Sequence, residues 1–349
     1  MPEPVTGRGR GVRANVRAFG DEARSLMWHG VRRARRPAGK ARRGSIQVVC
    51  DRGSNAVQAG CPARRTGVRL TVLGSGSAGN ATLLQGLEQP VLIDVGLSYR
   101  EVARRLDSVG VPPDSVGAVV ITHAHGDHTR SAALFSRRHD VPLYATAATK
   151  ALLELARVAK AAPVPSWRLL VCDAASEICG FRFTPFEVSH DAAAETLAFV
   201  IDTPDGTVGF ATDVGTVTPV LRARFRDCRL LVIESNHAHD LLQVGPYARS
   251  TKARIGGSRG HLSNESLALF VRHDMGRSVR CLVLAHLSRV NNVPEIAEMT
   301  CREALAASGR DEVRVVVSRQ DRVAETVDLG AWTPRQRHGA LGRQVALPF

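Results

Sequence analysis

From Val68 onward, hydrophobic residues alternate with polar ones as in β-strands, and later in the chain they recur at helical spacing. The first strands are expected at 68–73, 81–84 and 90–94, with residues 85–89 connecting the last two as a hairpin. A capping box at Ser98-Tyr99-Arg100-Glu101 predicts a helix to Ser108. Further strands are expected at 117–122, 142–145, 167–172, 181–188, 198–202, 207–212, 229–233, 280–285 and 312–317, and helices at 130–138, 146–160, 216–226, 264–274 and 294–308. Runs of strands followed by alternating strands and helices favour an α/β fold of layered sheets with helices outside.

Outside this regular region the chain is basic and lacks hydrophobic periodicity. Residues 1–67 contain 15 Lys and Arg against 4 Asp and Glu, whereas the other 282 residues contain 32 against 29. A segment of that composition cannot bury enough apolar surface to fold by itself. We therefore expect residues 1–65 to be a disordered Arg-rich leader, either an electrostatic arm or an over-extended reading frame. One domain is expected over 66–320 and a C-terminal tail over 321–349.

Composition argues against two classes of protein. No run approaches the roughly 18 apolar residues of a membrane helix, and no apolar segment of secretory-signal length follows the basic leader. The seven cysteines are scattered and include no Cys-x-x-Cys pair, which is typical of reduced thiols. We expect a cytoplasmic protein that does not bind membranes. No pattern in the sequence indicates its oligomeric state.

Candidate chemistry is concentrated in the run Thr122-His123-Ala124-His125-Gly126-Asp127-His128, directly after the apolar stretch 117–121. Within six residues the motif has four side chains of the kind that bind metals, and a turn has no structural need for so many. Zinc, manganese and iron all accept imidazole and carboxylate donors. A solvated histidine-rich turn is the alternative. However, ligand-type residues also follow three later strands, at His190, Asp213 and His286. Each alone would be an ordinary surface residue, but together with the motif they predict a metal site.

A glycine-rich segment, Gly74-Ser75-Gly76-Ser77-Ala78-Gly79, matches the dinucleotide-binding pattern G-x-G-x-x-G. That site needs a helix starting at the third glycine, whereas a short β-type segment and a turn follow here. It is not a phosphate-binding P-loop either, because no Gly-Lys-Ser/Thr follows. We therefore expect no nucleotide cofactor. The segment predicts a tight turn near the metal site, where small residues let backbone approach closely.

The order of these residues resembles the metallo-β-lactamase superfamily, over roughly residues 66–320. The pattern is an early Asp94, the His-x-His-x-Asp-His motif, and then His, Asp and His. The resemblance implies an αββα sandwich with two divalent metal ions at one edge. It assigns the first metal to His123, His125 and His190, the second to Asp127, His128 and His286, and a bridging position to Asp213. It also implies that Asp94 orients a ligand histidine.

Two such ions can share a water, lower its pKa and hold the attacking and leaving oxygens of a hydrolysis. Asp127 can orient or deprotonate that water. Lactam-cleaving members typically have Cys at the Asp213 position, so a carboxylate there resembles the thioesterase, lactonase and phosphodiesterase branches. Four segments favour the last branch: 73–80, 234–237, 260–264 and 286–294. They are similar in order and spacing to bacterial single-strand DNA exonucleases linked to cell-wall histidine-kinase operons. Ala248 departs from that branch, which usually has Pro there, and so does the basic leader.

A polar, Gly-containing segment before His261 carries four cations: Arg249, Lys252, Arg254 and Arg259. We interpret it as a loop that tracks a phosphate backbone, with Tyr247 stacking on a base. A solvated surface loop accounts equally well for the charge alone. For a nucleic-acid substrate, His261 is a candidate phosphate contact or leaving-group acid. Otherwise it caps the helix expected from Asn264. Aromatic residues are sparse, so recognition is expected to rest on the backbone.

These observations predict a metal-dependent hydrolase, most specifically an exonuclease that acts on single-stranded DNA. The cofactors would be two zinc or manganese ions, and iron also suits the donors. A thioester or lactone hydrolase of the same fold is the second interpretation. A non-enzymatic, metal-loaded regulatory protein is the third, and it is disfavoured because every matched ligand position is filled.

Overall fold

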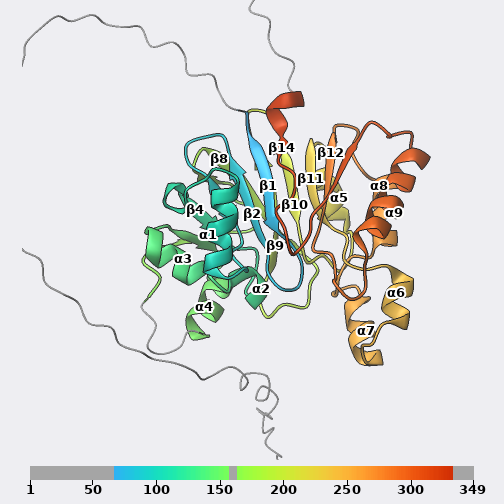
Figure 1. Ribbon diagram of the computed structural model, residues 1–349, viewed down its shortest axis with the longest axis horizontal. Coiled ribbons are helices and arrows are strands. Elements are labelled where there is room, and N and C mark those ends of the chain that lie inside the picture. The colour runs from blue at the N-terminus through green and yellow to red at the C-terminus, as the bar shows by residue number, and fades with distance from the viewer. Residues whose placement is uncertain (1–66, 157–162, 333–349) are drawn as a thin grey trace, which may run out of the picture. The chain divides into compact units, whose positions relative to one another are not determined.

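The computed structural model describes residues 67–156 and 163–332, so the expected leader at 1–65 lies outside the described residues. The described residues form two seven-stranded sheets (Figure 1). In the order β14-β1-β2-β3-β4-β5-β6, the first sheet contains β14 (Val327–Asp328), β1 (Arg69–Gly74), β2 (Ala81–Gln85), β3 (Val91–Ile93), β4 (Ala118–Val120), β5 (Leu143–Ala145) and β6 (Trp167–Leu169). In the order β13-β12-β11-β10-β9-β8-β7, the second contains β13 (Arg314–Val317), β12 (Cys281–Ala285), β11 (Leu230–Glu234), β10 (Val208–Ala211), β9 (Thr196–Asp202), β8 (Phe181–Val188) and β7 (Ser176–Ile178).

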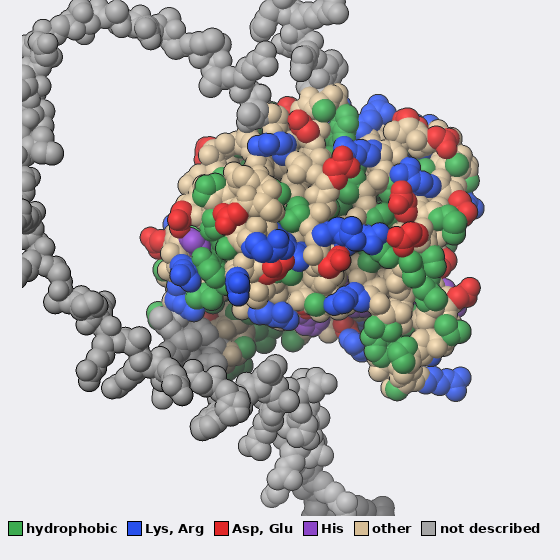
Figure 2. Space-filling view, in the orientation of Figure 1, with side chains coloured by type: hydrophobic (Ala, Val, Ile, Leu, Met, Phe, Trp, Pro, Cys, Tyr) green, Lys and Arg blue, Asp and Glu red, His purple; other side chains and the backbone are tan. Residues whose placement is uncertain are grey.

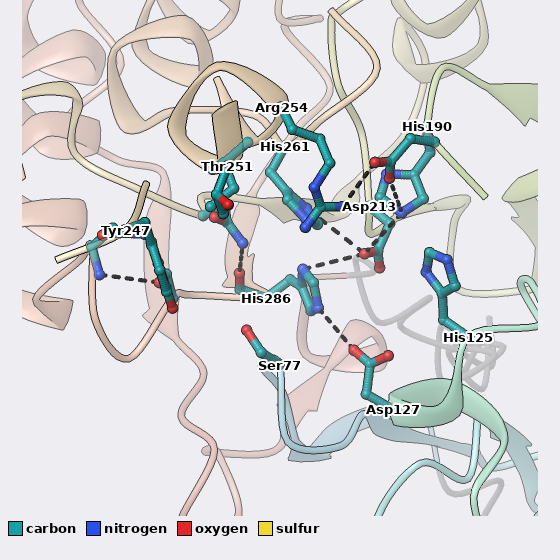
Figure 3. A pocket seen from close by; sticks show the side chains of 15 residues that line it. Ser77, His125, Asp127, His190, Asp213, Tyr247, Thr251, Arg254, His261 and His286 are labelled. Atoms are coloured by element: carbon teal, nitrogen blue, oxygen red, sulfur yellow. Dashed lines mark hydrogen bonds and ion pairs between the residues drawn. The ribbon is translucent and has the colours of Figure 1, made fainter. Parts of the chain in front are cut away.

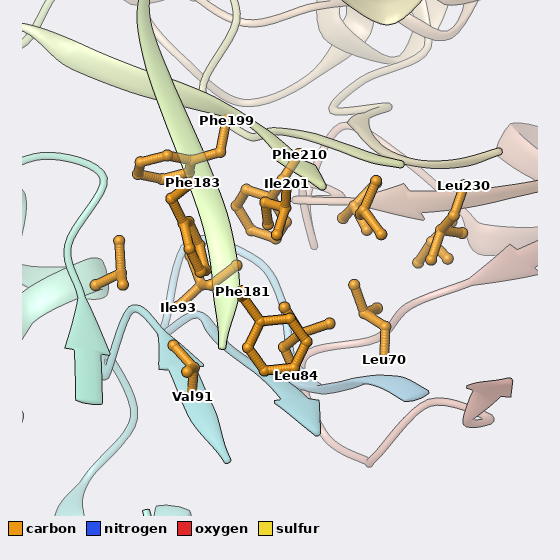
Figure 4. Close-up of a cluster of buried hydrophobic side chains, with 14 of the residues drawn as sticks. Leu70, Leu84, Val91, Ile93, Phe181, Phe183, Phe199, Ile201, Phe210 and Leu230 are labelled. Carbon is orange, nitrogen blue, oxygen red and sulfur yellow. The ribbon is translucent and has the colours of Figure 1, made fainter. Parts of the chain in front are cut away.

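The two sheets pack face to face around a core of aliphatic and phenylalanine side chains (Figure 4). Leu70 and Leu84 of the first sheet and Phe183 and Phe199 of the second all belong to this buried cluster. The two phenylalanine rings meet edge to face, with centroids 5.6 Å apart. Full burial of one such side chain stabilises the fold by about 1.5–3 kcal/mol, so this layer holds the sheets together.

Helices cover the outer face of each sheet (Figure 1). On the first sheet, α1 (Tyr99–Ser108) and α3 (Ala132–His139) bury their apolar faces. On the second sheet, α5 (Pro219–Phe225), α8 (Asn264–His273) and α9 (Pro294–Ala307) do the same. The remaining helices are α2 (Gly126–Thr129), α4 (Ala147–Leu155), α6 (His239–Val244), α7 (Arg249–Ile255) and the 3-10 turns Pro113–Ser115 and Leu329–Trp332. The expected αββα sandwich is confirmed.

Ser98 is the N-cap of α1, as expected, whereas the Glu101 carboxylate of the expected capping box accepts from Arg104 and Arg105. The Ser98 side chain accepts a hydrogen bond from the backbone N–H of Glu101. The Glu101 carboxylate in turn accepts from Nε of the buried Arg105 at 2.6 Å. The Arg105 guanidinium donates to the carbonyls of Leu73 at 2.6 Å and of Gln320 at 3.1 Å. Glu101, in the first turn of the helix, therefore positions Arg105. Arg105 in turn connects the end of β1 to the segment at Gln320 through hydrogen bonds.

The structure differs from the sequence-based expectations at several places, including β7 and α2, for which no element was expected. Residues 239–244, to which no element was assigned, and 249–255, expected as a loop, form the short helices α6 and α7. The expected helix 146–160 is described as α4 to Leu155, and residues 157–162 lie outside the described residues. Beyond residue 320, where a tail was expected, β14 pairs antiparallel with β1, and Val327 and Leu329 are buried. A two-residue strand is too short to show a periodic pattern.

The surface seen in Figure 2 carries cationic and anionic side chains intermixed, with no continuous stripe of one sign. In the described ranges, no helix is both long and apolar enough to span a bilayer. Five cysteines within those ranges are free thiols: Cys172, Cys179, Cys228, Cys281 and Cys301. The described part of the fold is therefore stabilised by packing and hydrogen bonds, without cross-links.

Candidate metal centre

Strand direction brings the predicted ligands to one edge of the sandwich. In the first sheet β3 and β4 are parallel, so Asp94 and the motif that starts at Thr122 follow adjacent strand ends. In the second sheet β9 is antiparallel to both β8 and β10, while β10, β11 and β12 are parallel. The ends of β8, β10 and β12 therefore lie at the same edge, and they lead to His190, Asp213 and His286.

Three of these residues have a backbone conformation that L-amino acids rarely adopt. The φ angles of Asp94, Asp213 and His286 are 61°, 57° and 56°. A residue in this left-handed region typically costs about 1–3 kcal/mol and persists where the surrounding structure enforces it. Each of the three comes one or two residues after a buried strand. The sharp turn at each strand end places its side chain in the cluster.

Histidine and aspartate side chains from distant parts of the chain converge here, and Figure 3 shows five of them around one cavity: His125, Asp127, His190, Asp213 and His286. One donor atom from each of His123, His125 and His190 lies within 4.8 Å of the others, and the same holds for Asp127, His128 and His286. Asp213 lies between the two groups. Its carboxylate oxygens are 3.0 Å from His128 Nε2, 3.6 Å from His190 Nε2 and 3.5 Å from His286 Nδ1.

The donor set fits divalent cations. His190 Nε2 and His286 Nε2 are both buried and make no hydrogen bond in the described part of the chain. Each is close to carboxylate oxygens: His286 Nε2 is 3.5 Å from Asp127, and His190 Nε2 is 3.6 Å from Asp213. A buried polar atom without a partner costs about 1–3 kcal/mol. Imidazole nitrogens around a carboxylate are ligands that zinc, manganese and iron accept. These atoms therefore have the position and chemistry of metal ligands.

Electrostatics within the cluster points the same way. Burial raises the pKa of Asp213, but the nearby His286 and His128 lower it well below the ordinary value. Burial lowers the pKa of His286, yet three neighbouring carboxylates raise it to about 10. The pKa of His123 is lowered, first by burial and then by the adjacent His128. Without a cation, protons on some imidazoles balance the charge of the buried carboxylates, and a metal would have to displace them.

Asp94 holds one of these histidines in place. Its Oδ2 accepts a hydrogen bond from His128 Nδ1 at 2.7 Å, and its Oδ1 accepts from the backbone N–H of Thr122 at 2.9 Å. With Nδ1 held by Asp94, Nε2 is the His128 nitrogen that faces Asp213 and that would bind a cation. The geometry is that of the orienting carboxylate that the resemblance implied.

Glu234 performs a similar task for two histidines, and the sequence reasoning gave it no role. The side chain is fully buried at the end of β11. Its Oε1 accepts from Nδ1 of both His261 and His286, each at 2.8 Å. Its Oε2 accepts from the backbone N–H groups of Val214 at 2.6 Å and Leu262 at 3.2 Å. A carboxylate directly after a buried strand was the available signal, the same one that marked His190, Asp213 and His286.

The glycine-rich segment is a tight turn between β1 and β2 beside the cluster, as predicted, and no helix follows it. Asn80 organises it: its Oδ1 accepts from the backbone N–H of Gly76 at 2.9 Å, and its Nδ2 lies 3.0 Å from His128 Nε2. Ser75 Oγ accepts from the backbone N–H of His286 at 2.8 Å. Gly79, with φ of 151°, leaves no room for a Cβ, which would lie 2.7 Å from the Gly96 carbonyl oxygen. The turn therefore holds His128 and the backbone of His286 in the cluster.

The cluster opens into a cavity of about 380 Å³. Tyr247, Arg254 and His261 line it together with Asp127 and Asp213 (Figure 3). Arg254 forms an ion pair of 2.8 Å with Asp191 in the cavity wall. The cavity is polar and accessible, so a substrate can reach His190 and His286 from this side.

The prediction that the cationic segment before His261 is a loop is wrong, because most of it is helical. Arg249, Lys252 and Arg254 lie on helix α7, which ends at Ile255 before Gly256. A single buried residue, Ile255, anchors this short helix, so no hydrophobic period was visible. Arg259, in the loop that follows, donates to the backbone carbonyl of His190 at 3.2 Å. The four cations thus occupy different environments.

His261 does not cap α8, so that alternative is wrong. Ser263 is the N-cap, and its side chain accepts from the backbone N–H of Ser266. His261 instead lines the cavity and donates through Nδ1 to Glu234. Burial lowers the pKa of His261, but the neighbouring Glu234 carboxylate raises it, and the pKa lies above the ordinary value. The ring is placed to meet a substrate.

Comparison with known proteins agrees with this geometry. The chain matches the family model described as the beta-lactamase superfamily domain over residues 89–287. It is 30% identical over 241 residues to the exodeoxyribonuclease WalJ of Streptococcus pneumoniae serotype 2, which covers 69% of this chain and 89% of that protein. It is 29% identical over 243 residues to the exodeoxyribonuclease YycJ of Bacillus anthracis, covering 70% and 91%. Its fold is similar to the metallo-beta-lactamase fold protein YhfI from Bacillus subtilis, with 18% identity, a TM-score of 0.55 and coverage of 74% and 98%.

The matched region includes the complete cluster. It begins before β3 and ends at Leu287, one residue after His286. It therefore spans Asp94, the histidine motif and the three later strand ends that the fold brings together. Sequence, fold and site geometry agree, and the chain belongs to the metallo-β-lactamase superfamily as one of its hydrolases.

Proposed function

We propose that the chain is an exonuclease that hydrolyses single-stranded DNA at a centre of two divalent metal ions. The observation that carries the proposal is the pair of buried nitrogens His190 Nε2 and His286 Nε2, which make no hydrogen bond in the described part of the chain and face the carboxylates of Asp213 and Asp127 at the wall of an open cavity. Two relatives named exodeoxyribonucleases support the choice of substrate. The assignment of His123, His125 and His190 to one ion and Asp127, His128 and His286 to the other is part of the proposal.

Bound in this cluster, two cations would lower the pKa of a shared water and stabilise charge on the leaving oxygen. Asp127 lines the cavity. Burial raises its pKa, but the neighbouring His128 and His286 rings, each 3.5 Å away, lower it below the ordinary value. A carboxylate with a low pKa is a weak base. We therefore assign Asp127 to orient the attacking water.

His261 is placed to act on the leaving group. Its Nδ1 is held by Glu234, which leaves Nε2 to face substrate. As water attacks the phosphorus and the P–O bond to the departing nucleotide breaks, a protonated His261 donates its proton to that oxygen. Glu234 supports this role because it raises the pKa of the ring against the effect of burial.

Two side chains on the α7 side of the cavity are proposed to contact the strand. Tyr247 lines the cavity and is partly exposed, so its ring is available to stack on a base. Arg254 also lines it, but Asp191 already pairs with this guanidinium. A strand phosphate would have to share Arg254 with that carboxylate. We expect binding to depend on salt and to show little sequence selectivity.

The test is cleavage of labelled single-stranded DNA, duplex DNA and RNA, with Mn²⁺ or Zn²⁺, beside a panel of thioesters and lactones. We expect Asp127→Ala and His125→Ala to lower turnover of single-stranded DNA about 10³-fold or more. His273→Ala, an exposed histidine on α8, is the matched control and should retain full activity. Turnover of thioesters or lactones without DNA cleavage would favour the second interpretation instead. Full activity of Asp127→Ala at normal metal content would contradict the proposed centre.

The domain boundaries are also a proposal. We propose that residues 66–349 fold and bind metal without the leader. Free thiols in the described ranges support a reducing compartment such as the cytoplasm. Expression of residues 66–349, followed by thermal melting and metal analysis, tests the first point. Loss of the fold or of metal binding would show that the leader is needed.

A further inference from the structure

A second cavity of about 380 Å³ lies next to the metal cavity, and His261 lines both. Helices α6, α7 and α8 surround it, and its lining is polar and cationic. The residues that matter here are His237, Arg249, Lys252, Ser263 and Ser266. The proposed chemistry at the metal centre does not use any of these five.

His237 is the buried member of this lining. Its side chain is 2% exposed, and its Nδ1 has no hydrogen-bond partner in the described part of the chain. Buried polar atoms in proteins are almost always paired, so an orphan nitrogen on a cavity wall is typical of a ligand contact. Burial lowers the pKa of His237. The neutral ring keeps one N–H, which can donate to an anion.

Two cations in this lining remain available to a ligand. In the described ranges, Arg249 makes no ion pair and no side-chain hydrogen bond, whereas Arg254 on the same helix is paired with Asp191. Lys252 donates one hydrogen bond from Nζ to the carbonyl of Gln243, which leaves further N–H groups.

The start of α8 adds to the positive potential. Ser263 and Ser266 line the cavity at the N-terminus of this ten-residue helix, where backbone dipoles favour an anion. The neighbouring Glu265 uses its carboxylate to accept from the backbone N–H of His239 at 3.1 Å. Among the described residues, the cavity therefore combines an arginine without an ion pair, a lysine with N–H groups to spare, a helix N-terminus and a buried imidazole nitrogen without a hydrogen bond.

We propose that this second cavity binds a phosphate group of the nucleic-acid strand, adjacent to the phosphodiester at the metal centre. The inference rests on the proposed nuclease function and deepens it. His261, as the shared wall, would separate the scissile phosphate from the second one. The bound group is either a terminal phosphate or a phosphate within the strand, and both present the same oxygens to Arg249, Lys252 and His237.

Phosphate binding is measured without relying on catalysis. Inorganic phosphate is titrated calorimetrically into the metal-loaded, full-length protein and its variants. Phosphate that binds at the metals is common to all of them, so differences report on the second cavity. We expect Arg249→Gln and Lys252→Gln each to weaken this binding about tenfold. Arg272→Gln makes the same charge change at the far end of α8 and should have no effect.

His237 has its own pair of variants. His237→Phe keeps the size of the ring without a donor and should weaken phosphate binding, whereas His237→Asn keeps an N–H near the Nδ1 position and should retain it. Thermal melting shows whether either variant is misfolded. Arg249 is exposed and Lys252 half-buried, so their variants test the inference even if both His237 variants unfold.

Oligonucleotides identify the source of the phosphate. A gain in affinity for a 5′- or 3′-phosphorylated strand, lost in Arg249→Gln, supports a terminal phosphate. An equal loss for unphosphorylated strands supports one within the backbone. The subsite is overturned, and the nuclease function stands, under two conditions. The wild-type protein cleaves DNA, and phosphate and oligonucleotides bind as tightly to all three variants, Arg249→Gln, Lys252→Gln and His237→Phe, as to the control Arg272→Gln. Altered phosphate binding in a protein that cleaves no nucleic acid would overturn the nuclease function instead.

Discussion

Replacing Glu234 by Gln changes a buried carboxylate that accepts hydrogen bonds from four N–H groups. One oxygen accepts from the Nδ1 atoms of His261 and His286, and the other from the backbone of Val214 and Leu262. A Gln amide can accept at only one of the two positions, and at the other its NH₂ group faces two donors. Two bonds to a charged acceptor are lost, each worth about 1.5–3 kcal/mol. We expect the free energy of unfolding of the metal-free protein to fall by about 3–6 kcal/mol.

The same substitution should weaken metal binding. Without the carboxylate, His286 is no longer held with Nδ1 protonated and Nε2 free, and loss of such an orienting partner typically costs about 10–100-fold in metal affinity. Chemical denaturation measures the stability, and competition with a chelator measures the affinity. Glu298→Gln on α9 is the control, because its exposed pair with Arg302 contributes about 0.3–0.5 kcal/mol. A Glu234→Gln protein as stable as this control, with unchanged metal affinity, would refute the reasoning.

Further predictions concern the other supports of the centre. Asp94→Asn should weaken metal affinity about 10–100-fold, measured by chelator competition, because Asp94 holds His128 Nδ1 at 2.7 Å; unchanged affinity would contradict this. Metal affinity should fall as pH decreases, by up to about tenfold per unit for each proton released. The raised pKa of His286, about 10, keeps its ring protonated at neutral pH in the metal-free protein, so proton release on metal binding should be measurable by calorimetry in two buffers; no release would disprove it. Gly96→Ala should lower the melting temperature and the metal content, because a Cβ would lie 1.5 Å from the Asp127 carbonyl oxygen; a normal melt would show that this loop yields.

Residues that are close in sequence, or that follow a recognisable strand, could be predicted. The motif from His123 to His128 is local, and its ligand chemistry is visible in the letters themselves. His190, Asp213 and His286 could be marked because each follows a buried strand, and their gathering required only that those strands end at one edge. The rejection of the glycine-rich segment as a nucleotide site also rested on local information, namely the strand that follows it.

The support of the site could not be predicted in the same way. Glu234 lies 27 residues from His261 and 52 from His286. The parallel pairing of β11 with β12 brings it beside His286, and the segment between α7 and α8 brings His261 to it. Helix α7 was missed because one buried residue, Ile255, carries its packing. Arg254 lines the metal cavity, whereas Arg249 and Lys252 line the second one. This distribution depends on how α6, α7 and α8 pack, and it cannot be predicted from the spacing of the residues along the chain.

By itself, the sequence determined the layered α/β fold and the donor atoms of the centre, because alternation of polar and apolar residues and a contiguous motif act over a few neighbouring positions. Only the tertiary structure decided which atoms remain without partners, such as His190 Nε2 and His237 Nδ1, and which carboxylates hold the rings. The physical reason is that burial and hydrogen bonding between distant residues depend on strand order, register and the turns after each strand.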